Sequence, residues 1–315
     1  MSFATVVFDF IDVLFDAPQN KRKVCKDKNK QVSVDKNIVY DTNRSDICSL
    51  DVFYPSVRDD KKLPAIFHIH GGGFVAGDKK HRRGLSTWLV KNAGVCVFNV
   101  NYGLAPKDKF PQPIVDLVKA FNFMIANADK YNIDTDKIFV LGDSAGGYYS
   151  AMMGALHCSK ELQDKFGVEL KGKIYGAILD CGIYDLEQAL CAKTLFNISG
   201  HIVKDYLGTT IDKIKEYELC ELLSPINFID ENFPKTFVTY AEQDFFCGGQ
   251  GELLIRKLQE LGVTCKHYHS VKFGENHTFP LTWTSKGAKE NNKLMLEFLL
   301  EEIEADNIAD TNTAT

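Results

Sequence analysis

Short apolar segments alternate with longer amphipathic segments along most of the chain, and this alternation restricts the fold more than any other feature. The apolar runs cover residues 65–70, 95–100, 137–141, 177–180, 236–240 and 265–271, and a half-buried strand pattern covers 47–54. Segments with helical spacing lie between them, at 83–92, 114–128, 146–157, 252–261 and 291–304. Apolar strands separated by amphipathic helices predict an α/β fold with a mostly parallel central sheet and helices on both faces.

The order of the predicted strands also indicates where a site would form. In parallel sheets of this kind, the loops at the carboxyl ends of the strands gather at one edge, and ligands bind there. The segments that follow residues 70, 141, 240 and 271 should therefore lie on one rim of the sheet.

Three segments fall outside the alternation. The N-terminal one begins with apolar residues at helical spacing, which fit either a helix packed on the core or a lid helix over a pocket: Phe3, Val7, Phe10 and Leu14. The segment at 186–222 has a helical pattern and would form a cap with the N-terminal one, and the C-terminal segment has too little apolar content to pack. The predicted organisation is an α/β core at 46–185 and 223–304, cap segments at 1–45 and 186–222, and a disordered tail at 305–315.

The charge pattern argues against two classes of partner. The net charge is −5, and Lys and Arg are scattered along the 315 residues rather than gathered in one segment. This gives no electrostatic case for nucleic acid or an anionic membrane as the main partner. The apolar N-terminus carries acids and lacks a basic leading segment, which argues against a signal peptide, and no apolar stretch reaches transmembrane length. We expect a cytoplasmic protein without integral membrane association.

Nine cysteines, an odd number, are spread along the chain with no two at CxxC spacing. Several lie in apolar runs, such as Cys96 in Val95-Cys96-Val97-Phe98. This predicts buried free thiols in a reducing compartment. Without paired ligand spacing a zinc site is not expected, and the sequence indicates neither a metal nor an organic cofactor.

The segment Gly142-Asp143-Ser144-Ala145-Gly146 directly follows a predicted strand and directly precedes a predicted helix. In that context a G-x-S-x-G turn holds the serine in a strained backbone conformation and exposes its Oγ. The helix N-terminus offers backbone N–H groups and a positive dipole end to a developing oxyanion. Ser144 is therefore the candidate nucleophile; the alternative is a glycine-rich turn with an idle serine.

A glycine-rich loop, His70-Gly71-Gly72-Gly73, follows another predicted strand. Successive glycines let the backbone approach a ligand and leave N–H groups that can donate to an oxyanion. A phosphate-binding loop or a plain turn is the alternative. The loop lacks the Lys-Ser/Thr ending of a P-loop and the spacing of a dinucleotide site.

A nucleophilic serine needs a base and an acid, which follow it in the chain order Ser, Asp or Glu, His in this kind of fold. His277 lies in a turn-rich segment after the last predicted strand, where a neutral imidazole would take the serine proton near pH 7. Asp244 and Glu242 both follow the strand that ends at Tyr240, and spacing alone does not choose between them.

The order of these motifs resembles the hormone-sensitive-lipase-like branch of α/β-hydrolases, which includes many bacterial carboxylesterases. The likeness covers residues 45 to 303 and rests on an ordered set of motifs: His70-Gly71-Gly72-Gly73, Asn101-Tyr102-Gly103-Leu104-Ala105-Pro106, Phe110-Pro111, Gly142-Asp143-Ser144-Ala145-Gly146-Gly147, Ser224-Pro225, Phe233-Pro234 and the segments around Asp244 and His277. The resemblance implies an α/β-hydrolase fold with a helical cap.

The resemblance also implies roles for single residues. It implies a catalytic triad of Ser144, His277 and Asp244, with Asp244 rather than Glu242 as the acid. It implies an oxyanion hole made by the backbone N–H groups of Gly72, Gly73 and Ala145, with His70 holding the shape of the loop. A homodimer through the sheet edge near residues 265–271 is a further candidate from the family.

Three positions depart from the family pattern. Gly103 stands where an arginine is usual, and His277 is followed by Thr278 rather than glycine. The acid lies in Ala241-Glu242-Gln243-Asp244-Phe245-Phe246 instead of the usual Gly-x-x-Asp-Pro-Leu. None of these removes a catalytic group, but they bear on loop packing and substrate preference.

The function that the resemblance implies is a serine carboxylesterase acting on a small-molecule ester with a short- to medium-chain acyl group, because the family's cap narrows the acyl pocket. One alternative is an amide, formamide or peptide hydrolase with the same triad, since this fold hosts several acyl-transfer reactions. The other is a non-catalytic binding protein, as in a plant hormone receptor of this branch that keeps the pocket but lacks the catalytic histidine.

Overall fold

The computed structural model describes residues 2–11, 17–191 and 197–313, and these are organised around one eight-stranded sheet. The strands, in chain order, are β1 Val32–Val39, β2 Ser49–Pro55, β3 Leu63–Ile69, β4 Cys96–Val100, β5 Ile133–Asp143, β6 Gly176–Asp180, β7 Lys235–Ala241 and β8 Cys265–Ser270. They lie in the order β1-β2-β4-β3-β5-β6-β7-β8. The pairs that β2 makes with β1 and β4 are antiparallel, and all others are parallel. The mostly parallel sheet predicted from the sequence is confirmed.

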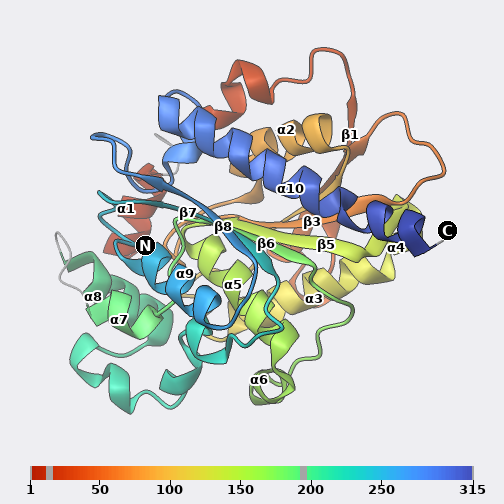
Figure 1. The fold of residues 1–315 in the computed structure, drawn as a ribbon. Coiled ribbons are helices and arrows are strands. Elements are labelled where there is room, and N and C mark those ends of the chain that lie inside the picture. The colour runs from red at the N-terminus through yellow and green to blue at the C-terminus, as the bar shows by residue number, and fades with distance from the viewer. Residues whose placement is uncertain (1, 12–16, 192–196, 314–315) are drawn as a thin grey trace.

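Helices cover both faces of the sheet: α2 Arg83–Ala93 and α10 Lys286–Thr313 lie on one face, and α3 Gln112–Ala126, α5 Ala145–Cys158 and α9 Gln250–Glu260 lie on the other (Figure 1). The remaining α-helices are α1 Phe3–Ile11, α4 Ala128–Tyr131, α6 Lys160–Phe166, α7 Leu186–Cys191 and α8 Ile198–Ile202. Short 3-10 turns connect these elements at η2 Ala17–Lys21, η3 Lys23–Cys25, η4 Thr42–Arg44, η5 Lys79–Arg82, η8 Ile211–Glu216, η9 Cys220–Leu222, η10 Pro225–Phe228 and η11 Phe279–Thr282, and a π-turn covers η7 Val203–Leu207.

The apolar runs form the centre of the sheet because both of its faces are covered. Every residue of β4 is buried, and so are the last five residues of β3. Separate apolar clusters fill the space between the sheet and the helices on its two faces, one including Phe67 and Phe121 and the other including Phe139 and Phe298. This double burial is the physical reason why the strands read as continuous apolar runs rather than as alternating patterns.

The predicted cap segment 1–45 is too long, because residues 32–39 belong to the sheet. They form β1, which pairs antiparallel with β2 and lies at the sheet edge. The pairing register shifts between Asp35 and Ile38, and Asn37 has a φ of 56°. An irregularity of this kind interrupts the alternation of side chains, which hides a strand from a periodicity argument.

The predicted disordered tail at 305–315 is also corrected, because α10 continues to Thr313; residues 314–315 lie outside the described part of the chain. Extending an existing helix adds one hydrogen bond for each residue that is fixed, so propagation is far less costly than nucleation. A low apolar content is therefore a poor guide to where a long, already packed helix stops.

The N-terminal helix α1 packs beside α8 at one end of the molecule, near α7 (Figure 1). Its buried residues are Ala4 and Phe8, whereas Phe3 and Phe10 are 46% and 63% exposed. Of the predicted apolar face of Phe3, Val7, Phe10 and Leu14, Phe3 and Phe10 are therefore exposed rather than packed, and Leu14 lies outside the described residues. The helix is apolar nearly all round, so spacing did not define one face.

Residues 186–191 and 197–222, predicted to be helical, contain α7, α8 and several short turns. In the described residues, no helix is both long and apolar enough to span a membrane. All nine cysteines lie in the described ranges and are free thiols, of which Cys191 is exposed.

Candidate active site

Ser144 occupies the turn between β5 and α5. Its backbone has a φ of 54°, a left-handed value that is costly for a residue with a side chain. Its N–H donates to the carbonyl of Asp180 on the neighbouring strand at 2.8 Å, which helps to hold this conformation. A side chain at Gly146 would overlap the carbonyl oxygen of Ile69 on β3, so only glycine lets α5 begin this close to the sheet.

A buried ion pair lies directly behind this turn. The Asp143 carboxylate accepts two hydrogen bonds from Arg82, from Nε and Nη2, each at 2.6 Å. Both side chains are almost completely buried. Burial raises the pKa of Asp143, but the Arg82 guanidinium outweighs this effect and holds that pKa below its usual range. The pair ties the nucleophile turn to η5, the segment that follows the glycine loop.

His277 lies between Ser144 and Asp244. Its Nε2 is 2.8 Å from the Ser144 Oγ, and its Nδ1 is 2.8 Å and 3.0 Å from the two carboxylate oxygens of Asp244. The three residues follow β5, β7 and β8, whose carboxyl ends meet at one edge of the sheet. The three residues that the sequence singled out as a candidate triad are therefore brought together, in an arrangement suited to moving a proton from a hydroxyl to an imidazole.

The charged forms of Asp244 and His277 stabilise each other. Burial raises the pKa of Asp244, but the adjacent His277 and the N–H groups of Phe246 and Cys247, each donating to Oδ1 at 2.8 Å, bring that pKa below its usual range. Burial lowers the pKa of His277, and the neighbouring Asp244 carboxylate outweighs it, so the pKa lies well above its ordinary value of 6.5. Asp244 therefore stays ionised and orients the imidazole.

Glu242, the competing acid in the sequence, is exposed, whereas Asp244 is buried against His277. We expect Asp244→Asn to lower kcat about 10⁴-fold, because an amide no longer holds the imidazole in the required tautomer. Glu242→Gln is the matched control and should leave kcat unchanged. Steady-state hydrolysis of p-nitrophenyl acetate measures both; equal losses in the two variants would contradict the choice of Asp244.

The glycine loop after β3 faces Ser144, the candidate nucleophile. Gly73, Ser144 and Ala145 line one cavity. Within the described residues, the backbone N–H groups of Gly72, Gly73 and Ala145 donate to no acceptor in the protein. His70 is buried, one of its ring nitrogens is 2.8 Å from the carbonyl oxygen of Gly71, and its ring stacks on Tyr102. These contacts are consistent with the predicted role of His70 in shaping the loop.

The cavity in front of Ser144 is small and has mostly apolar walls. Its walls come from α1, α7, α8 and the segment after β7, through Phe8, Leu190, Ile198, Ile202 and Phe246. A small number of polar groups at one end of an apolar cavity is the usual form of a small-molecule site.

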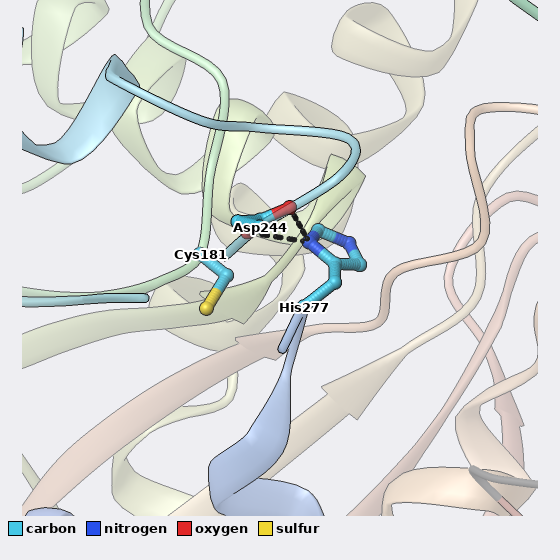
Figure 2. A group of neighbouring side chains, drawn as sticks. All are labelled: Cys181, Asp244 and His277. Atoms are coloured by element: carbon cyan, nitrogen blue, oxygen red, sulfur yellow. Dashed lines mark hydrogen bonds and ion pairs between the residues drawn. The ribbon is translucent and has the colours of Figure 1, made fainter. Parts of the chain in front are cut away.

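Cys181 lies close to Asp244 and His277, and one potential ligand atom from each of the three is within 4.8 Å of the others (Figure 2). As arranged, the group is a poor metal site. His277 Nδ1 already lies against the Asp244 carboxylate, and in Figure 2 the Cys181 sulfur points away from the imidazole. Burial raises the pKa of the Cys181 thiol well above its ordinary value, so a cation would have to displace protons from both sulfur and ring.

Gly103, where the family usually has an arginine, is crowded by an arginine from elsewhere. A Cβ at Gly103 would lie 2.8 Å from Nη2 of Arg44. The Arg44 guanidinium bonds Asp108 at 2.6 Å and Asp116 at 2.9 Å, and Asp116 also accepts from the Gly103 N–H. The side chain of Arg44 thus supplies a positive charge beside this loop.

Several residues around the site carried no signal in the sequence. Arg82, Cys181 and Cys247 are buried against the candidate triad or its supporting turn, but none belongs to a recognisable motif. Asp180, next to the turn, is a further buried acid, and burial raises its pKa to about 7. Phe8 reaches the site from the other end of the chain, a contact that only the fold creates.

The chain matches a family model and several known proteins. Residues 50–258 match the family described as BD-FAE. An esterase of Gibberella moniliformis is 33% identical over 74% of this chain and 72% of its own length. An α/β hydrolase of Acanthamoeba polyphaga mimivirus is 27% identical over 95% of this chain and 86% of its own length.

Among solved structures, esterase B of Lactobacillus rhamnosis superimposes with a TM-score of 0.81. The match covers 98% of both chains at 19% sequence identity, so it supports the α/β-hydrolase fold rather than a shared substrate.

Proposed function

Because the chain belongs to the BD-FAE family of α/β-hydrolases and is a carboxylic ester hydrolase, we propose that it hydrolyses short- to medium-chain acyl esters with Ser144 as the nucleophile. The observation that carries this proposal is the unbroken hydrogen-bonded sequence from Ser144 Oγ through the His277 ring to the Asp244 carboxylate. No metal or organic cofactor takes part in the proposed reaction.

The proposed reaction has two steps. In the first, Oγ of Ser144 attacks the ester carbonyl while His277 Nε2 accepts the serine proton. The ring then donates that proton to the oxygen of the leaving alcohol. In the second, His277 takes a proton from water, the hydroxide attacks the acyl-enzyme, and the acid is released as the proton returns to Ser144. Asp244 holds the ring and stabilises its positive form in both steps.

The carbonyl oxygen gains negative charge in both steps. The backbone N–H groups of Gly72, Gly73 and Ala145 are the proposed donors, supported by their lack of other acceptors in the described residues. Ala145 is the first residue of α5, so the positive end of the helix dipole favours the same charge. The acyl chain would occupy the apolar cavity, and among the described residues that line it no side chain carries a charge to recognise a charged acyl group.

A substrate panel tests the proposal. We expect p-nitrophenyl esters from acetate to octanoate to be hydrolysed, and aryl amides with the same acyl groups to react far more slowly. Faster turnover of the amides would favour the rival amide, formamide or peptide hydrolase. No turnover of any member, together with no labelling by a fluorophosphonate probe, would favour a non-catalytic binding protein.

The pH dependence follows from the charge state of His277. Only the neutral imidazole accepts the serine proton, and the Asp244 carboxylate raises the His277 pKa well above 6.5. We therefore expect kcat/KM to fall as pH is lowered through a midpoint above 6.5. In Asp244→Asn the midpoint should move to lower pH, because the negative charge that favours the imidazolium is gone. The value of kcat/KM reached at high pH should also be lower than in the wild type. A pH–rate profile in which the variant keeps the same midpoint would contradict this assignment.

We also propose a homodimer and a cytoplasmic location. The described part of β8 forms one edge of the sheet, which is where the homodimer suggested by the family resemblance would form. Light scattering on the purified protein tests the dimer. The free thiols fit the proposed cytoplasmic location.

A further inference from the structure

The side chain of Phe8 lies inside the candidate site although α1 is far from it in sequence. The ring is only 6% exposed and is part of the cavity that contains Ser144. A Cβ placed on Gly73, one of the candidate oxyanion donors, would overlap three atoms of the Phe8 ring. The ring thus covers the glycine loop directly, where the acyl group of a bound ester would begin.

A second aromatic ring continues this wall toward the base. Phe8 and Phe246 have their ring centroids 5.8 Å apart, and Phe246 lies edge-on to the His277 ring at 5.2 Å. Phe246 belongs to the same short segment as Asp244, so its position is tied to the acid. Phe8 lies on a different element, α1, which packs against α8, for example through the rings of Phe3 and His201, whose centroids are 4.8 Å apart.

The space available to an acyl chain therefore depends on Phe8. Other apolar walls, such as Leu190 and Ile202, come from the helices α7 and α8. Phe8 is the residue of α1 that lines this cavity, and its ring lies between the glycine loop and the α1 backbone. A longer chain can extend in that direction only if the ring is removed or displaced.

We propose that Phe8 is the residue of α1 that sets the upper limit of acyl chain length, by closing the cavity directly over Gly73. This inference rests on the proposed ester hydrolysis at Ser144. It makes the N-terminal helix part of the substrate-binding surface. On this proposal, Phe8 on the buried face of α1 contacts the acyl group, whereas Phe10 on the exposed face does not.

The test compares ratios of kcat/KM for p-nitrophenyl octanoate and acetate. Each methylene that gains a buried site improves binding about fourfold. We therefore expect Phe8→Ala to raise the octanoate-to-acetate ratio at least about tenfold, which corresponds to two newly buried methylenes. Phe8→Trp should lower the butyrate-to-acetate ratio, because a larger ring takes up more of the same space.

Phe10→Ala is the matched control, since it removes the same side chain from the same helix but from its exposed face. It should leave the ratios as in the wild type. Thermal unfolding of each variant checks that the fold is retained, and Phe8→Trp keeps the test informative if Phe8→Ala loosens α1.

The outcomes separate this inference from the function on which it rests. Active Phe8→Ala and Phe8→Trp enzymes with unchanged ratios would overturn the role of Phe8 while leaving the esterase assignment intact. A shift of equal size in Phe10→Ala would also overturn it, because the effect would then come from a general loosening of α1. A wild-type protein that hydrolyses no ester would instead overturn the proposed function.

Discussion

Ser144→Ala is expected to abolish ester hydrolysis, with a loss in kcat of about 10⁶-fold. The Ser144 Oγ is the hydroxyl that lies 2.8 Å from Nε2 of His277, and Ser144 lines the same cavity as Gly73 and Ala145. The remaining rate over water, about 10³–10⁴-fold, would come from the oxyanion donors and substrate binding alone. Steady-state kinetics with p-nitrophenyl acetate provide the measurement.

Covalent labelling gives an independent readout of the same variant. A fluorophosphonate probe should label the wild type at one site and leave Ser144→Ala unlabelled. Ser150, in the following helix, offers a matched control because it is a buried serine of α5 outside the triad. Ser150→Ala should still be labelled, and persistent labelling of Ser144→Ala would rule out Ser144 as the nucleophile.

The largest expected effect on stability comes from the ion pair behind the nucleophile. Arg82→Ala would leave the Asp143 carboxylate buried without its partner, at a cost of about 3–5 kcal/mol in the free energy of unfolding. The Asp143 pKa, now held low by Arg82, should rise in the variant because burial alone favours the neutral acid. Urea unfolding followed by tryptophan fluorescence measures the loss.

Two controls show whether burial is the cause. Lys107 and Asp46 form an ion pair that is 3.6 Å long and about 70% exposed at both side chains, so Lys107→Ala should cost less than about 1 kcal/mol. Replacing both buried partners, as in Arg82→Met with Asp143→Leu, should cost less than Arg82→Ala, since no unpaired charge remains. A small loss in Arg82→Ala, equal to that of Lys107→Ala, would contradict the argument.

Much of the fold could be predicted from the sequence because apolar runs and helical spacing are local patterns. The predicted strand at 95–100 corresponds to β4 at Cys96–Val100, and the predicted helix at 83–92 corresponds to α2 at Arg83–Ala93. Two predictions failed, each for a physical reason. The irregular pairing near Asn37 concealed β1, and the continuation of α10 to Thr313 depends on a helix already packed along the sheet.

The candidate site, like the fold, could be predicted from the sequence only in part. The order of the glycine loop, the G-x-S-x-G turn, Asp244 and His277 could be read in the sequence, because each motif sits at the end of a strand and parallel strands bring those ends to one edge. The choice between Asp244 and Glu242 could not be made from spacing. The fold separates them, since the buried Asp244 is 2.8 Å from His277 Nδ1 and Glu242 is exposed.

By itself, then, the sequence determined the class of fold, the position of the turn that carries Ser144 and the residue types available for acyl transfer. Only the tertiary structure decided which groups surround them: Arg82 against Asp143, Arg44 beside Gly103 and Phe8 over Gly73. Local patterns reflect the backbone geometry of neighbouring residues in the chain. Contacts between residues that are distant in the chain, such as Arg82 and Asp143, depend on how complete helices and strands pack, and no short pattern encodes them.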